Sequence, residues 1–367
     1  MKNKVRVGIL FGGKSAEHEV SLQSAKNVAD AIDKDRYEVS LIGIDKSGRW
    51  LLPNQSQYLL NESNPKLIKL NSENEQSVAL VPQSGGKLTN LTDSESHTTI
   101  DVLFPILHGP FGEDGTVQGL LKLANIPFVG ASVLGSAIGM DKDVMKRLLR
   151  DAGIPFAKFL VFKKGDLVEF EAVSNELGLP LFVKPANLGS SVGVSKVKNK
   201  EEFDKAVTDA FAYDTKILVE ETVVGREIEC SVLGNQDPIA SVPGEILSSH
   251  EFYSYEAKYI DENGAVLKIP ADISEETKNN IQELAVKTFK TLECEGLGRV
   301  DFFLKENGEL VVIEINTIPG FTKISMYPRL WEASGVSYTE LIGRLLQLAI
   351  ERHEREKGLQ TSFALGD

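Results

Sequence analysis

Cysteine is scarce in this sequence. Its 367 residues include two cysteines, Cys230 and Cys294. Two thiols cannot make the disulfide framework of a small secreted domain, nor a metal site built from cysteine alone. Cys230 alternates with Ile228 and Val232, which predicts a core thiol rather than a nucleophile. A reducing, cytoplasmic compartment is therefore the simplest expectation.

Long apolar runs and an excess of positive charge are also missing. No run approaches the roughly 18 residues of a membrane span, and the start lacks the apolar region of a signal peptide. The net charge is −13, from 53 acidic and 40 basic residues, whereas sequence-independent nucleic-acid binding needs a basic surface. We therefore expect neither a membrane nor a nucleic-acid partner. The 25% charged content and the 31 scattered glycines exclude disordered, collagen and coiled-coil classes.

The N-terminal part has the pattern of an open α/β sheet. Residues 5–11 are apolar and β-branched and end at two glycines, which predicts a buried strand. A helix is expected next, with Ser15 as its N-cap. Residues 37–44 predict a second strand. This order is a right-handed βαβ unit. Residues 53–99, rich in Asn, Ser, Gln and Lys, predict an irregular surface insertion with a β-ribbon, and residues 101–107 predict another buried strand.

The remainder alternates between strands and helices in two further units, so that the length predicts two or three domains. The first unit has expected strands at 159–162, 181–184, 194–197 and 217–220 and helices at 169–177 and 201–212. The second has expected strands at 227–233, 239–246, 267–270, 298–305 and 309–316 and helices at 275–292 and 338–352.

Two loops at strand ends carry the first candidate residues. Glu17 follows a glycine turn that leads into a helix, where N–H groups favour an anion; a carboxylate at this place suits the ammonium group of a ligand instead. Taken alone, the pattern is explained more simply by a tight turn that requires glycine. His108 lies with Glu113 and Asp114 at the carboxyl end of strand 101–107, where such sheets bind ligands. A solvated loop is the alternative.

A lysine at a strand end gives the next signal. Lys184 precedes the glycine- and serine-rich loop 189–193, and Lys142 offers a second cation. Lysines, serine hydroxyls and loop N–H groups together can hold phosphate oxygens. Glu220 and Glu221 end a strand and can accept hydrogen bonds from an adenine amino group or a ribose. An exposed lysine on a glycine hairpin, and ordinary solvated acids, are the alternatives.

Two strands joined by a turn give the strongest signal. The first strand carries Arg299 and Asp301, and the second carries Glu314 and Asn316. Because side chains alternate along a strand, a hairpin can bring Asp301, Glu314 and Asn316 together as oxygen ligands that suit Mg²⁺ on nucleotide phosphates. The solvated face of an edge hairpin is less favoured, since polar residues among Val, Ile and Phe are costly to bury without partners. The polar, tyrosine-bearing segment 248–262 predicts a long loop that acts as a lid, or else a surface excursion with packed tyrosines.

Together these motifs resemble the D-alanine–D-alanine ligases of the ATP-grasp superfamily. The matches extend from Val5 to about Ile350 and follow the family's order and spacing. They comprise residues 15–21, 108–109, 113–115, 139–142, 183–185, 189–193, 255–259, 298–301 and 314–320.

The resemblance implies a three-domain ATP-grasp architecture, α/β and α+β, that opens with a parallel-sheet domain. The implied domains are 1–140 with the insertion 53–99, a small central domain at 141–222, and a C-terminal domain at 223–367 that carries the lid. ATP would lie between the last two domains. A homodimer is also expected, because family members are often dimeric.

The resemblance also implies a role for each candidate residue. Phosphates would be held by Lys142, Lys184 and Ser191, and the base and ribose would be bordered by Glu220, Glu221, Val223 and Glu227. Two Mg²⁺ ions, which Mn²⁺ can replace, would be bound by Asp301, Glu314 and Asn316. The first D-alanine would contact Glu17, with His108 nearby, and the tetrahedral oxyanion would be stabilised by Arg299 and the N–H of Gly320. The second D-alanine would contact Ser325, Met326 and Lys258, and Glu17, Ser190 and Tyr259 would form a hydrogen-bonded triad.

The implied activity is ATP-dependent ligation of two D-alanines through a D-alanyl phosphate, for peptidoglycan synthesis. Two alternatives stay open: a D-alanine–D-lactate ligase of the same fold, and a non-catalytic nucleotide-binding regulator. The intact set of Arg299, Asp301, Glu314 and Asn316 counts against the regulator, because a sensor needs no oxyanion donor.

Overall fold

The computed structural model describes residues 4–52, 58–61, 64, 67–71, 76–93, 97–248 and 265–360. The predicted lid therefore lies outside the described residues, except for Ser248, and so do Lys258 and Tyr259. None of the helices within these ranges has the length and apolar character needed to cross a membrane.

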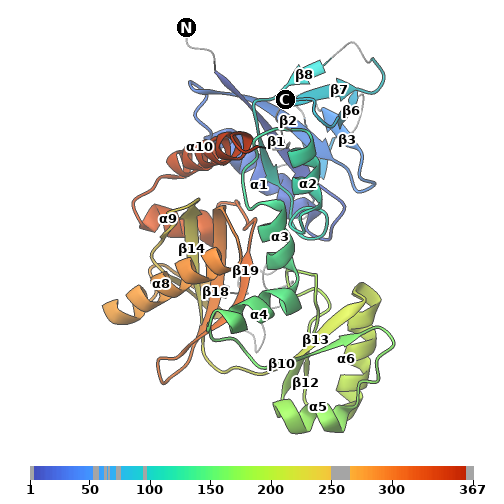
Figure 1. Ribbon diagram of the computed structural model, residues 1–367, viewed down its shortest axis with the longest axis vertical. Coiled ribbons are helices and arrows are strands. Elements are labelled where there is room, and N and C mark those ends of the chain that lie inside the picture. Colours follow the sequence, from blue (N-terminus) through green and yellow to red (C-terminus); the bar gives the residue numbers. More distant parts are fainter. Residues whose placement is uncertain are drawn as a thin grey trace, which may run out of the picture.

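A seven-stranded sheet, here the N-terminal sheet, forms the upper part of the molecule in Figure 1. Its strands are β1 (Val5–Gly12), β2 (Tyr37–Ile44), β3 (Trp50–Leu52), β6 (Gln76–Leu80), β7 (Lys87–Asn90), β8 (His97–Thr99) and β9 (Val102–Ile106). They lie in the order β8-β7-β6-β3-β2-β1-β9, and β2, β1 and β9 are parallel. The predicted βαβ unit is confirmed, with α1 (His18–Ala31) between β1 and β2.

Two details of this sheet differ from the sequence prediction. Helix α1 begins at His18 rather than just after Ser15, because Ser15 Oγ accepts the N–H of Glu17 at 3.1 Å and forms a turn instead of a cap. The insertion is not merely a surface excursion. Its strand β6 pairs with β3 and extends the sheet, while β4 (Leu59–Leu60) and β5 (Lys69–Leu70) form a separate ribbon. Leu80 and Leu88 of the insertion are buried in the core that covers this end of the sheet.

The central sheet is a small antiparallel unit. Its strands are β10 (Phe159–Lys163), β11 (Leu181–Pro185), β12 (Ser195–Val197) and β13 (Lys216–Glu221), in the order β10-β13-β11-β12. Helices α5 (Phe170–Leu177) and α6 (Lys200–Tyr213) cover one face of it (Figure 1). Val173 and Phe203 of these helices are buried against Val183 and Val219 of the strands, in a core of their own.

The C-terminal sheet is also antiparallel. Its strands are β14 (Arg226–Gly234), β15 (Ile239–Ala240), β16 (Gly244–Ser248), β17 (Ala265–Lys268), β18 (Gly296–Leu304) and β19 (Leu310–Asn316). Residues 239–246, predicted as one strand, form two short strands, because Pro243 lacks the N–H that a continuous ladder requires. Helix α8 (Glu275–Thr291) packs on this sheet, and α9 (Met326–Ala333), which the sequence reading did not include, follows β19.

Three helices connect the N-terminal sheet to the rest: α2 (Thr116–Leu123), α3 (Val133–Met140) and α4 (Lys142–Asp151). Figure 1 shows α4 beside the C-terminal and central sheets. Asp141 caps α4 by accepting the N–H groups of Asp143 and Val144, each at 3.1 Å, so the helix begins directly at Lys142. This cap places the first side chain of the helix at the point where the two sheets meet.

The last helix returns to the start of the chain. Helix α10 (Tyr338–Lys357) lies beside the N-terminal sheet (Figure 1). Its residues Leu341 and Leu345 share one buried cluster with Val7, Ile9 and Phe104 of β1 and β9. The two ends of the described chain therefore stabilise each other. The domain boundaries at residues 140 and 222 stay predictions.

Candidate active site

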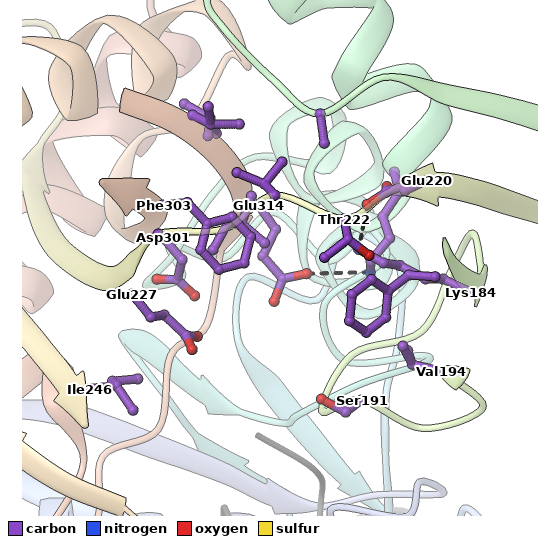
Figure 2. Close-up of a pocket in the computed structure, with 18 of the residues that line it drawn as sticks. Lys184, Ser191, Val194, Glu220, Thr222, Glu227, Ile246, Asp301, Phe303 and Glu314 are labelled. Carbon is purple, nitrogen blue, oxygen red and sulfur yellow. Dashed lines mark hydrogen bonds and ion pairs between the residues drawn. The ribbon is translucent and has the colours of Figure 1, made fainter. Parts of the chain in front are cut away.

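A cavity of about 550 Å³ lies between the central and C-terminal sheets. Figure 2 shows Glu227, Asp301 and Glu314 on the side of the C-terminal sheet, and Lys184 and Ser191 on the opposite side. Basic and hydroxyl groups thus face carboxylates across one space. This arrangement suits a ligand with both an anionic part and groups that donate hydrogen bonds.

Two of the predicted lysines reach into this cavity. Lys142 Nζ donates to the carbonyl of Leu188 at 2.6 Å and lies 3.4 Å from Glu314 Oε2. Lys184, near the end of β11, donates to Glu220. Both side chains are largely buried, so an anion here would meet ammonium groups that water screens little.

The strand pair β18–β19 places the predicted metal ligands together. Asp301 pairs with Glu314, and Arg299 pairs with Asn316. Asn316 Nδ2 donates to Asp301 Oδ2 at 2.9 Å, which orients the asparagine amide. Across the described residues, no three His, Cys, Asp or Glu side chains converge as a metal cluster; this set has two carboxylates and one amide. Hard oxygen donors of this kind fit Mg²⁺.

Arg299 is held beside this set by two carboxylates. Its Nε lies 2.7 Å from Asp301 Oδ1 and 2.8 Å from Glu229 Oε2, and a second guanidinium nitrogen lies 2.8 Å from Asp301 Oδ2. Asp301 and Glu229 pair across β18 and β14, and both are buried. The guanidinium is thereby fixed next to the carboxylates of β18 and β19.

A second cluster surrounds Glu17, at the start of α1. Ser190, in the loop after β11, donates its hydroxyl to the carboxylate of Glu17, so this contact joins the cavity to the N-terminal sheet. His108 is buried nearby, and its Nδ1 lies 3.0 Å from the carbonyl of Ile318. Burial lowers the pKa of His108, against the opposing influence of Glu17. The imidazole is therefore neutral at pH 7 and donates from Nδ1.

Residues 317–325, here the Gly320 loop, are held by side chains from α1. Ser24 Oγ accepts the N–H of Phe321 at 3.2 Å, and Asn27 Nδ2 donates to the carbonyl of Phe321 at 3.3 Å. Within the loop, Ser325 Oγ accepts the N–H of Thr322 at 2.9 Å. A side chain at position 320 would place its Cβ 2.8 Å from Ser325 Oγ, so a larger residue there would displace the Ser325 hydroxyl.

Glu113 also reaches this loop. One carboxylate oxygen accepts the N–H of Gly109 at 2.7 Å, and the other accepts the N–H of Ile318 at 3.2 Å. Burial, together with the charge of Glu17, raises the pKa of Glu113 to about 8. The sequence reading noted Glu113 as part of a motif without giving it a role. In the structure it connects the loop after β9 to the Gly320 loop.

Not every predicted residue presents its side chain to the cavity. Glu221 lines the cavity together with Val223, although one oxygen of its carboxylate accepts the N–H of Lys158 at 2.8 Å. The side chain of Met326 is buried with Ile246 and Leu330. Several residues that line the cavity were not predicted from the sequence, among them Lys146, Lys196 and Glu245. Lys146 lies one turn after Lys142 on α4, a spacing that does not by itself separate a cavity residue from an exposed one.

A cavity between two antiparallel sheets, with lysines facing carboxylates, is the arrangement of an ATP-grasp ligase. Two family models match the chain, the D-ala D-ala ligase N-terminus over residues 6–131 and the D-ala D-ala ligase C-terminus over residues 148–347. The chain belongs to the D-alanine–D-alanine ligase family.

Relatives extend over nearly the whole chain. A D-alanine–D-alanine ligase of Oceanobacillus iheyensis is 59% identical over 366 residues, which cover 99% of this chain and 100% of the relative. D-alanine–D-alanine ligase A of Escherichia coli K12 is 54% identical over 363 residues, 98% of this chain and 100% of that one.

Solved structures agree with this assignment. The D-alanine–D-alanine ligase of Coxiella burnetii has a TM-score of 0.84 at 40% identity and covers 96% of both chains. The VanG D-Ala:D-Ser ligase of Enterococcus faecalis has a TM-score of 0.82 at 37% identity and covers 95% of this chain and 100% of that one. The same fold thus occurs in a protein named for a different second substrate.

Proposed function

We propose that the chain joins two D-alanines into D-alanyl-D-alanine at the expense of ATP and so supplies a precursor of peptidoglycan. One observation carries the proposal. The cavity with opposed lysines and carboxylates is joined, through the contact between Ser190 and Glu17, to a second polar cluster beside the Gly320 loop. A nucleotide and an amino acid would thus meet at this junction.

The first step activates a carboxylate, which is a poor electrophile. A carboxylate oxygen of the first D-alanine attacks the γ-phosphorus of ATP, and ADP leaves. Glu17 would hold the ammonium group of this D-alanine, with His108 beside it. In the cavity, we assign the phosphates to Lys142, Lys184 and Ser191, and the base and ribose to Glu220, Glu221, Val223 and Glu227.

The donor set on β18 and β19 has the chemistry of a magnesium site. Asp301, Glu314 and Asn316 would hold two Mg²⁺ ions, or Mn²⁺ in their place. When bound, such ions offset the negative charge of phosphate oxygens. Lys142, 3.4 Å from Glu314, adds a fixed positive charge from the protein itself.

The second step forms the peptide bond. The amine of the second D-alanine attacks the acyl carbon and loses a proton, and phosphate leaves. Arg299 and the N–H of Gly320 would stabilise the oxyanion that develops. Ser325, Met326 and Lys258 would position the second D-alanine. Tyr259 would extend the contact of Ser190 with Glu17, and segment 248–262 would exclude water from the acyl phosphate. The assignments of Lys258, Tyr259 and the lid rest on the sequence resemblance.

Phosphate release from ATP in the presence of D-alanine tests the function directly. We expect Mg²⁺-dependent release, with D-alanyl-D-alanine as the product identified by mass spectrometry. Competition with D-lactate and D-serine then gives the second-substrate preference. A dominant D-alanyl-D-lactate product would support the depsipeptide alternative, and nucleotide binding without phosphate release would support the regulator. We also propose a cytoplasmic location and a homodimer, and light scattering checks the latter.

A further inference from the structure

Lys146 is an almost completely buried lysine in the cavity wall, where burial lowers the pKa of its ammonium group and the charge of Glu220 opposes that shift. It lies on α4, one turn after Lys142, and its side chain is 1% exposed. Lysine is almost never fully buried unless it is paired. Its Nζ lies 3.3 Å from Glu220 Oε1 and 5.5 Å from the ring centroids of both Phe156 and Phe159. Lys146 has no role in the proposed ligation steps.

The partner of Lys146 is a carboxylate with one oxygen still available. Glu220 Oε2 accepts a hydrogen bond from Lys184, on the side of the cavity where Figure 2 shows both residues. Glu220 Oε1 is buried and, within the described part of the chain, makes no directed hydrogen bond. Lys146 therefore forms an ion pair with this oxygen, but a lone pair of the oxygen can still accept a hydrogen bond from a ligand.

The two lysines determine the protonation state of Glu220. Burial alone would raise the pKa of this carboxyl, but the charges of Lys146 and Lys184 hold it down at about 2. An ionised carboxylate only accepts hydrogen bonds, whereas a protonated one also donates. Lys184 will be drawn toward any phosphate that enters the cavity, and Lys146, fixed behind the carboxylate, will then remain its cation.

We propose that Lys146 is a positioning residue that keeps Glu220 an acceptor-only group, and so selects a nucleotide base with an exocyclic amino group over one with a carbonyl at the same position. The proposal rests on the proposed function, because it places the base against Glu220. A carbonyl facing an ionised carboxylate leaves two buried acceptors without a donor, which is costly in a desolvated pocket.

A purely structural role for Lys146 is the competing explanation, and Arg352 provides a matched control. Arg352 is also a buried cation over an aromatic ring, 4.5 Å from the centroid of Phe128. Its guanidinium donates to the carbonyls of Gly130 and Phe128, at the contact between α10 and the N-terminal sheet. Replacing Arg352 should therefore lower the stability of the fold but leave nucleotide binding unchanged.

The test compares ATP with ITP, which carries a carbonyl in place of the amino group. For Lys146→Met we expect the KM for ATP to rise about tenfold, because that factor corresponds to the loss of one hydrogen bond between the base and a charged acceptor. We expect the ATP:ITP ratio of kcat/KM to fall by a similar factor, with kcat changed far less. Lys146→Arg should retain the ratio, and Arg352→Met should lower the thermal unfolding midpoint with an unchanged ratio. A folded Lys146→Met protein with the wild-type ratio would overturn the proposal.

Two further measurements keep the test decisive. If Lys146→Met does not fold, the wild-type ATP:ITP ratio between pH 5.5 and pH 8 serves instead. A constant ratio is expected for a carboxylate that stays ionised, and a ratio that falls as the pH is lowered would refute the role of Lys146.

Calorimetric titration with the Mg²⁺ complexes of ATP and ITP measures the same base preference as a ratio of binding constants, without turnover. Failure of the proposed ligation is therefore distinguishable from failure of base selection.

Discussion

At the residue scale, the negative charge of Glu314 should be essential, because this carboxylate lies where phosphates and metal ions would bind. Glu314 pairs with Asp301 across the hairpin and lies 3.4 Å from Lys142. We predict that Glu314→Gln lowers kcat by about 100-fold or more, because an amide supplies no charge where phosphate and metal charges must balance. Thermal unfolding should stay close to wild type, as should the activity of Glu306→Gln in the exposed turn between the strands. Near-normal turnover at saturating Mg²⁺ would remove Glu314 from the metal set.

Glu113 should make stability depend on pH. Its pKa is raised from 4.5 to about 8, so between these values the folded chain holds a proton that the unfolded chain has released. Stability therefore falls as the pH rises through this window, by at most about 1.4 kcal/mol per unit. We predict that Glu113→Gln flattens this dependence: its thermal midpoint should drop less between pH 5.5 and pH 7.5 than that of wild type. Parallel curves would contradict the raised pKa.

At the residue scale, the sequence predicted contacts made by neighbouring strands better than contacts made across the chain. Asp301, Glu314 and Asn316 follow from side-chain alternation in a hairpin. The burial of Lys146 does not follow in this way. A lysine one turn after Lys142 has the same pattern whether it faces water or a cavity. What buries it are Glu220 and two phenylalanines, which arrive from other elements.

The Gly320 loop shows how one element positions another. Its backbone is held by Ser24 and Asn27 of α1, although it belongs to the C-terminal part of the chain. Ser24→Ala leaves the buried N–H of Phe321 without its acceptor, which costs about 1–3 kcal/mol. We predict that kcat falls about tenfold with little change in the KM for ATP, because small displacements of an oxyanion donor are costly.

Ser47→Ala is the control for this prediction, since Ser47 lies in an exposed turn of the N-terminal sheet. Steady-state kinetics and thermal unfolding of both variants check it. Equal kinetics for the two variants would mean that Ser24 serves only the fold.

At the element scale, the sequence prediction was wrong where the same residue types can either begin a helix or interrupt it. Ser15 has the residue type of an N-cap, but its hydroxyl instead closes a turn on Glu17, and the helix starts three residues later. Helix α9 was overlooked because Pro328 in its first turn looks like a helix breaker, although a helix tolerates proline there. Long periodic elements such as α8 and β18 were placed within a residue or two.

At the scale of the whole molecule, the buried core does not follow the order of the sequence. Helix α10, at the end of the described chain, covers strands from its beginning, and one apolar cluster contains both. Apolar periodicity predicted the helix, but nothing in its residues states which sheet it covers. The central sheet, in contrast, buries its apolar side chains under its own two helices. The central sheet therefore has a core that is separate from the cluster joining α10 to β1 and β9.

Two core substitutions should separate these two cores. Leu345, on α10, and Phe203, on α6, are both buried, in the shared core and in the central core respectively. Leu345→Ala and Phe203→Ala should each cost about 2–5 kcal/mol, but in different places. We predict that Leu345→Ala speeds amide hydrogen exchange in β1 and β9, far away in sequence, and leaves β11 and β13 unchanged. Phe203→Ala should do the reverse, because local opening follows the core that is weakened. If both variants accelerated exchange equally throughout the molecule, the two cores would unfold as one cooperative unit, and the separate central core would carry no independent stability.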